Sequence, residues 1–105
     1  MDDRQDLPID REGLVALAES VLRGEGAAAA ELSVSFVGEE EMADLHERYL
    51  GEPGPTDVLA FPLDEVDEDG TRVLGDVVIC PAVAARNNPS DPASELRLLL
   101  VHGVL

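Results

Sequence analysis

The chain has 105 residues and a net charge of −16, which arises from 23 Asp and Glu against seven Arg and no Lys. Its length and near-zero mean hydropathy predict one small globular domain over residues 1–105. We expect a cytoplasmic protein with no membrane partner, because the sequence shows no long apolar run, no export leader and no second cysteine beside Cys80. Such a charge repels nucleic acid at long range, so composition alone argues against RNA and DNA binding. The simplest explanation of the charge is an acidic surface in contact with solvent.

The first half of the chain predicts a helix, a strand and a second helix. Residues 1–9 are polar, and we expect no regular element there. Asp10 can cap a helix that runs to about Leu22, with apolar residues on one face. Apolar residues alternate with Ser over residues 32–36, the pattern of a strand with one buried face. Residues 39–50 then predict a helix with three Glu in its first turn.

The middle of the chain predicts two strands joined by an acidic connection. Residues 51–55 are rich in Gly and Pro and predict a rigid turn, followed by a short strand over residues 58–61 that Pro62 ends. Residues 64–70 carry five acids and an Asp-Gly pair, which favours a solvated hairpin tip. The nearly continuous apolar run over residues 74–80 favours a central, buried strand.

Two helices complete the predicted order. Pro81 suits the first position of a short helix that ends near Arg86, and Asp91 with Pro92 suits the cap and first residue of the last helix. The order helix, strand, helix, strand, strand, helix, helix predicts a small α+β domain.

The last helix has no C-terminal signal in this sequence. Val101-His102-Gly103-Val104-Leu105 is followed by no capping Gly or Asn and no Pro. A second imidazole on the same helix face as His102 would fall four residues on, just beyond Leu105. We therefore expect a fragment that is incomplete at its C-terminus.

His102 is the leading candidate for chemistry. A lone His among apolar residues is more often part of a core than a ligand. Gly103 beside it favours function, because Gly inside a helix costs about 1 kcal/mol relative to Ala, and its presence indicates close approach of backbone or of a ligand. His46 is interpreted as a packing or surface residue, and Cys80 as a small buried apolar residue.

The segment from Gly54 to Pro62 is a second candidate. Its Gly and Pro residues fix the backbone, and Thr56 and Asp57 offer polar groups where a strand begins. Asp57 either caps the turn by accepting hydrogen bonds from nearby backbone N–H groups, or faces a substrate together with Thr56 at the edge of a cleft. Spacing alone does not separate these two readings.

Three stretches together resemble the bacterial YbeY family, the metal-dependent endoribonucleases of rRNA maturation. They are Gly54–Pro62, Leu74–Cys80 and Val101–Leu105, in the order of the family. The last stretch matches the start of the family motif His-Gly-x-Leu-His-x-x-Gly-x-Asp-His. The similarity extends from about Leu32 to the end of the chain.

The resemblance implies a zincin-like α+β fold, in which a small mixed sheet is packed with helices. Compared with the family, we expect this chain to be truncated within the metal-binding helix and to have a reduced or missing N-terminal strand. His102 matches the first of three His ligands of one Zn²⁺ and would be the catalytic and metal residue; the other two have no counterpart in the chain. In zinc peptidases a Glu follows the first His, whereas here Gly103 follows it, so the resemblance argues against a protease.

The implied activity is single-strand endoribonuclease action in rRNA processing and ribosome biogenesis, with rRNA, the small ribosomal subunit and assembly factors as partners. Thr56, Asp57 and Arg48 are the substrate-binding candidates; the family often has Arg after the aromatic residue of the second helix, but here Leu50 follows Tyr49. With one zinc ligand, we expect the chain alone to be inactive. Two alternatives stay open, a non-catalytic ribosome-assembly interaction protein and a metal hydrolase of another substrate.

Overall fold

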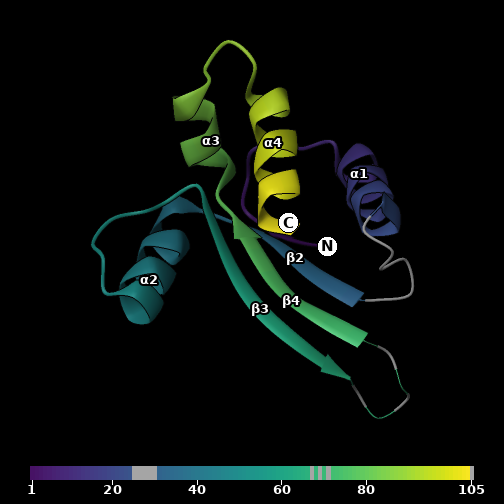
Figure 1. Cartoon of the computed structure of the whole chain (residues 1–105). Coiled ribbons are helices and arrows are strands. Elements are labelled where there is room, and N and C mark those ends of the chain that lie inside the picture. The colour runs from purple at the N-terminus through teal and green to yellow at the C-terminus, as the bar shows by residue number, and fades with distance from the viewer. Residues whose placement is uncertain (25–30, 67, 69, 71, 105) are drawn as a thin grey trace.

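A computed structural model describes residues 1–24, 31–66, 68, 70 and 72–104 (Figure 1). Within these residues the chain forms an α+β domain of four strands and four helices. In chain order the elements are β1 (Asp2–Arg4), α1 (Arg11–Gly24), β2 (Glu31–Val37), α2 (Glu39–Leu50), β3 (Val58–Val66), β4 (Arg72–Ile79), α3 (Pro81–Asn87) and α4 (Pro92–Val104).

The strands form one mixed sheet in the order β1-β2-β4-β3. β1 and β4 both pair parallel with β2, and β3 pairs antiparallel with β4 at the edge. β4 therefore lies inside the sheet, as its apolar sequence predicted. Its residues Val77, Val78 and Ile79 are buried, because helices cover both faces of the sheet.

The two faces of the sheet are covered by different helices. Figure 1 shows α1 and α4 on one side and α2 on the other. The core under α1 and α4 is built from Leu14, Ala18, Val34, Phe36, Val77, Ile79, Ala84, Leu96, Leu99 and Leu100. The core under α2 is built from Val37, Met42, Leu59, Val78, Cys80 and Val83. Successive strand residues alternate between these cores, which follows from the two-residue period of a β-strand.

The expectation that residues 1–9 are irregular is wrong for residues 2–4. These three exposed residues form β1, which pairs with Ser35, Phe36 and Val37 of β2. The pairing uses backbone groups at the open edge of β2, so it leaves no apolar alternation in the sequence. An ion pair of 2.9 Å between Arg4 Nη2 and Glu41 Oε2 joins β1 to α2.

The prediction that Pro62 ends a strand at Phe61 is also wrong. β3 continues through Pro62, which lies opposite Gly75, to Val66, with a register shift between Pro62 and Glu65. An edge strand tolerates Pro because its missing N–H can face away from the neighbouring strand. Residues 64–66 therefore belong to the strand, and residues 67, 69 and 71 of the predicted hairpin tip lie outside the described residues.

The predicted helix starts are confirmed. The Gly13 N–H donates to Asp10 Oδ1 at 3.1 Å, Pro81 begins α3, and the Ser94 N–H donates to Asp91 Oδ1 at 3.2 Å. The Ser94 hydroxyl also donates to Asp91 Oδ2, at 2.6 Å. In the described part of the chain, every helix is too short or too polar to cross a bilayer.

Asp91 gives the domain a predicted acid sensitivity. The hydrogen bonds from the Ser94 hydroxyl and N–H stabilise its carboxylate and lower the pKa of Asp91 below its ordinary value of 3.8. A lowered folded-state pKa adds stability above the unfolded pKa, and this is lost as pH falls through the folded value. We expect Asp91→Asn to have a lower Tm at neutral pH but to lose less Tm below about pH 4. Thermal unfolding from pH 7 to 2, with Glu19→Gln as control, measures this; equal acid slopes for Asp91→Asn and the parent would contradict it.

Candidate functional site

His102 lies in the last turn of α4 with its side chain exposed. Leu98, one turn earlier on the same helix face, is 60% exposed. The buried residues of α4 are Leu96, Leu99 and Leu100, which face the sheet and α1. The His102 side chain is therefore not part of the core, and its imidazole is accessible to a ligand.

Gly103 is explained by close helix-to-sheet packing. A Cβ atom built on Gly103 would lie 2.7 Å from Cγ1 of Val77 and 3.5 Å from Cγ2 of Val58. The groups that approach this glycine are the side chains of Val77 and Val58, rather than the backbone or ligand that the sequence suggested. Its lack of a side chain lets the last turn of α4 rest on β3 and β4, and this contact fixes the position of His102 relative to the sheet.

The described residues do not by themselves form a metal site. No group of three or more His, Cys, Asp or Glu side chains that could hold an ion is found in the part of the chain described. The second histidine, His46, lies on α2, across the sheet from α4. A three-histidine zinc site needs donors beyond His102, so its role as a ligand stays a prediction.

From this we expect the 105-residue chain to bind zinc weakly. Complete structural zinc sites release about 10–16 kcal/mol, and a single exposed imidazole lacks most of that coordination. Competition with a chromophoric chelator at micromolar protein should show no stoichiometric uptake. One tightly bound zinc ion per chain would contradict the expectation.

Asp57 holds the segment before β3 in place. The Val58 N–H donates to Asp57 Oδ1 at 2.8 Å, and the Asn87 side-chain amide donates to Asp57 Oδ2 at 3.3 Å. The Cys80 N–H donates to the Asp57 carbonyl at 2.9 Å. This geometry favours the capped-turn reading of Asp57. Thr56 is half-buried beside it, with its hydroxyl 3.4 Å from Asp57 Oδ1.

His46 closes the same segment from the other side, a role that sequence reasoning missed. Its Nδ1 lies 2.9 Å from the Gly54 carbonyl, and its Nε2 lies 3.1 Å from Glu52 Oε2, with only 12% of the side chain exposed. Both partners offer oxygen acceptors to the ring nitrogens. His46 therefore ties α2 to the turn, whose Gly51 and Gly54 have positive φ angles.

Three of the basic residues that could attract a phosphate have acidic or polar partners within the protein. Arg48 forms an ion pair of 2.8 Å with Asp44, one helical turn away, and both side chains are exposed. Arg86 of α3 pairs with Glu39 of α2. Arg97 donates to the Ser94 hydroxyl at 3.2 Å. Binding a phosphate through Arg48 would require this pair to open, although an exposed pair contributes little stability.

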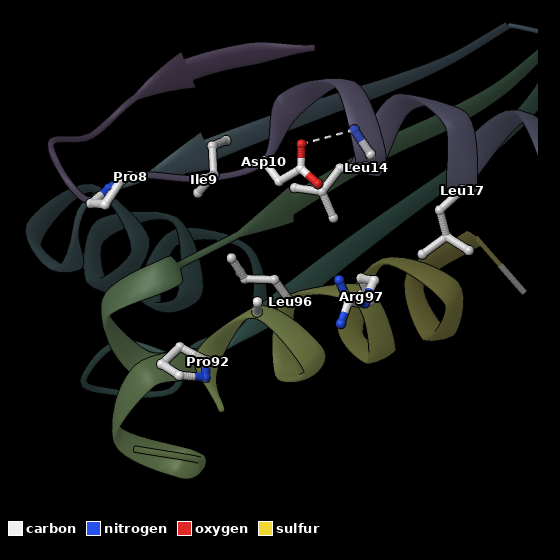
Figure 2. Close-up of a pocket in the computed structure, with 10 residues that line it drawn as sticks. Pro8, Ile9, Asp10, Leu14, Leu17, Pro92, Leu96 and Arg97 are labelled. Carbon is white, nitrogen blue, oxygen red and sulfur yellow. Dashed lines mark hydrogen bonds between the residues drawn. The ribbon is translucent and has the colours of Figure 1, made fainter. Parts of the chain in front are cut away.

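A cavity of about 580 Å³ lies between the start of α1 and α4 (Figure 2). Its walls are mainly apolar and include Ile9, Leu14, Leu17 and Leu96. Asp10 also lines it, but this carboxylate caps α1. The lining residues include neither His nor Cys, so this cavity is not the candidate catalytic site.

Comparison with known proteins assigns the family. The model of the endoribonuclease YbeY family matches residues 1–105. The chain belongs to the YbeY family. It is 46% identical to the endoribonuclease YbeY of Cutibacterium acnes over 93% of the chain and 70% of that protein. It is 54% identical to that of Acidothermus cellulolyticus, over 72% of the chain and 54% of that protein.

A solved structure supports the fold. The solution structure of a Thermotoga maritima protein matches 98% of the chain and 68% of that protein, with a TM-score of 0.67 and 28% identity. The predicted α+β, zincin-like fold class is confirmed. The YbeY family is a family of endoribonucleases, enzymes that hydrolyse RNA. The chain spans little more than half of the Acidothermus relative.

Proposed function

We propose that this chain is part of a metal-dependent endoribonuclease that cuts single-stranded RNA during rRNA processing and ribosome biogenesis. The observation that carries the proposal is the match of residues 1–105 to the YbeY family, together with an accessible imidazole at the position of the first family ligand. The proposed substrate is rRNA, the proposed partners are the small ribosomal subunit and its assembly factors, and the proposed location is the cytoplasm.

The proposed metal is Zn²⁺, with His102 as one ligand. No group of three or more possible ligand side chains is found among the described residues, and the chain spans 54–70% of the two relatives compared. We therefore propose that the remaining ligands lie in sequence outside these 105 residues. Imidazole nitrogen is a preferred zinc donor, which makes the ligand type chemically suitable.

The other residues near the site act as positioning groups in this proposal. Gly103 sets the height of the last turn of α4 above Val77. Asp57 joins the start of β3 to α3 through Asn87, so the segment with Thr56 is rigid before substrate arrives. A rigid segment lowers the entropy cost of orienting an RNA strand.

A second candidate is a non-catalytic protein that binds basic ribosomal proteins. The net charge of −16 and the internal pairing of Arg48 and Arg86 favour this alternative, because little free positive charge is left to attract phosphates. A metal hydrolase of another substrate is the third possibility. The three proposals differ in whether RNA is cut and whether a metal is needed.

Metal removal separates these proposals. A protein spanning the full length of its relatives should cut single-stranded RNA, lose this activity in EDTA and regain it when zinc is added back. A single-stranded DNA of the same sequence should stay intact. RNA cleavage that persists in EDTA would contradict metal dependence. A metal-loaded protein that leaves RNA intact but retains basic ribosomal proteins would support the interaction protein instead.

A further inference from the structure

A groove on the α2 side of the sheet has features that the catalytic proposal does not use. It has a volume of about 420 Å³, within the range of about 300–1,000 Å³ typical of ligand pockets. Every strand of the described sheet and α2 contribute to its lining, which consists of Arg4, Ser35, Leu45, Tyr49, Phe61, Asp76 and Val78. α4 and His102 belong to the opposite face.

An aromatic pair forms one wall of this groove. The rings of Tyr49 and Phe61 meet edge to face, with centroids 5.1 Å apart and an interplanar angle of 64°. Phe61 supports the Tyr49 ring from one side, yet Tyr49 remains 58% exposed. A large exposed aromatic ring fixed in one orientation is a stacking surface for a planar ligand.

Asp76 places a carboxylate in the same groove. It lies in the middle of β4, in register with Ser33 of β2 and Phe61 of β3, and it is exposed. Asp is depleted in strands, and the neighbouring Val77 and Val78 are buried. A carboxylate at this point adds nothing to the core, so its placement indicates a ligand with hydrogen-bond donors.

Charge in the groove excludes phosphate as that ligand. Arg4 already pairs with Glu41 at 2.9 Å and with Asp2 at 3.4 Å. Asp76 would repel an anion, and the overall charge of −16 acts in the same direction. A neutral, planar group with N–H donors fits the groove better than any anionic one.

We infer that this groove binds a single unstacked guanine base of single-stranded RNA, stacked on Tyr49 and hydrogen-bonded to Asp76. Guanine presents N1–H and N2–H side by side, which matches the two oxygens of a carboxylate in the bidentate manner of an Arg–carboxylate pair. Adenine, cytosine and uracil each place an acceptor next to their donor, which a carboxylate repels. The assignment of RNA as the source of the base rests on the proposed function, while the groove itself does not.

The groove also suggests how an acidic protein selects RNA. β3 lies at the edge of the sheet and directs Val58 toward the α4 side and Phe61 toward the α2 side. A strand of RNA can pass around this edge with one base in the groove and its phosphates in solvent. Because phosphate contacts are repulsive, affinity should rise with added salt, opposite to the salt dependence of ordinary RNA binding.

The single tyrosine allows a direct test. Tyr49 is the only Tyr and the chain has no Trp, so 3-fluorotyrosine labelling places one ¹⁹F probe in the groove. We expect titrations followed by the ¹⁹F shift to give a Kd for UUGUU at least about tenfold lower than the Kd for UUIUU or UUAUU. Inosine in UUIUU differs from guanosine only in lacking the 2-amino group. Affinity for UUGUU should increase between 50 and 300 mM salt.

Matched variants assign the effect to Asp76. Asp76→Asn should reduce the preference for UUGUU over UUIUU to about one, whereas Glu47→Gln, which removes the same charge from an exposed position of α2, should keep it. The ratio is measured within each variant, so it does not depend on small losses of folded protein. An unchanged ratio in Asp76→Asn, or equal binding of all three oligonucleotides to the parent, would overturn the inference.

Two further measurements distinguish a base within RNA from a free nucleoside, and distinguish this inference from the proposed nuclease function. At 300 mM salt, where repulsion between the protein and the phosphates is screened, UUGUU should bind more tightly than guanosine alone, because its flanking nucleotides pass around the edge of β3. Equal affinity at this salt concentration would overturn RNA as the source of the base. His102→Ala should bind UUGUU as the parent does, because its groove is intact. Guanine preference without any RNA cleavage by the full-length protein would leave this inference standing and remove the proposed function, and cleavage without guanine preference would do the reverse.

Discussion

Replacing His102 by Ala is expected to lower RNA cleavage by the full-length, zinc-loaded protein at least 100-fold. Loss of a residue that merely orients a metal ligand costs about 10–100-fold in affinity or activity, and loss of the ligand itself should cost more. The fold should be unaffected, because the His102 side chain is exposed and contributes nothing to the buried face of α4. Initial cleavage rates of a labelled single-stranded RNA, with zinc content measured on the same samples, test this.

His46 provides the matched control, since the chain has two histidines. His46→Gln removes the contacts to Gly54 and Glu52 but leaves α4 intact. We expect this variant to retain zinc and to lose less than about 30-fold in rate, the upper limit for two hydrogen bonds of about 1 kcal/mol each. Equal cleavage by His102→Ala and the parent would remove His102 from the mechanism. Equal losses in both variants would show that the assay reports folding.

The elements with a strong local pattern were predictable from the sequence. α2 occupies the predicted residues 39–50, and Asp10 and Asp91 cap α1 and α4 as expected. These features depend on periodicity and on capping within three residues. β1 was not predictable, because three exposed residues that pair only through their backbone carry no such pattern. The continuation of β3 through Pro62 depends on its edge position, which is a property of the assembled sheet.

In the candidate site, too, features with a local sequence pattern were predictable and features that depend on tertiary contacts were not. The residue types and order in Gly54–Pro62, Leu74–Cys80 and Val101–Leu105 together were enough to indicate the family, which comparison then established. The choice between the two readings of Asp57 depended on Asn87, thirty residues later in the chain. The reason for Gly103 depended on Val77 of another element. Such contacts arise from tertiary packing, and one sequence without its fold holds no signal for them.

Replacing Gly103 by Ala is expected to lower the free energy of unfolding by about 1–2 kcal/mol. Overpacking a core costs about 1–3 kcal/mol, and the higher helix propensity of Ala returns at most about 1 kcal/mol. The new Cβ would meet Cγ1 of Val77 at 2.7 Å. Val77 is 2% exposed and β-branched, so its side chain has no free rotamer into which it can move. Urea denaturation measures the change.

A double-mutant cycle shows whether the contact with Val77 is the cause. Val77→Ala alone leaves a cavity, but in that background the Cβ of Ala at position 103 fits, so the two changes should couple favourably by about 1 kcal/mol or more. Gly24→Ala is the control, because no atom of the described residues outside its own helix turn lies within 4 Å of a Cβ built on that glycine at the end of α1, and it should be neutral or slightly stabilising. Additive effects of the Gly103 and Val77 changes would exclude this contact as the reason for the glycine. A favourable coupling would show that the position of the helix turn bearing His102 is set by the packing of Gly103 against β4.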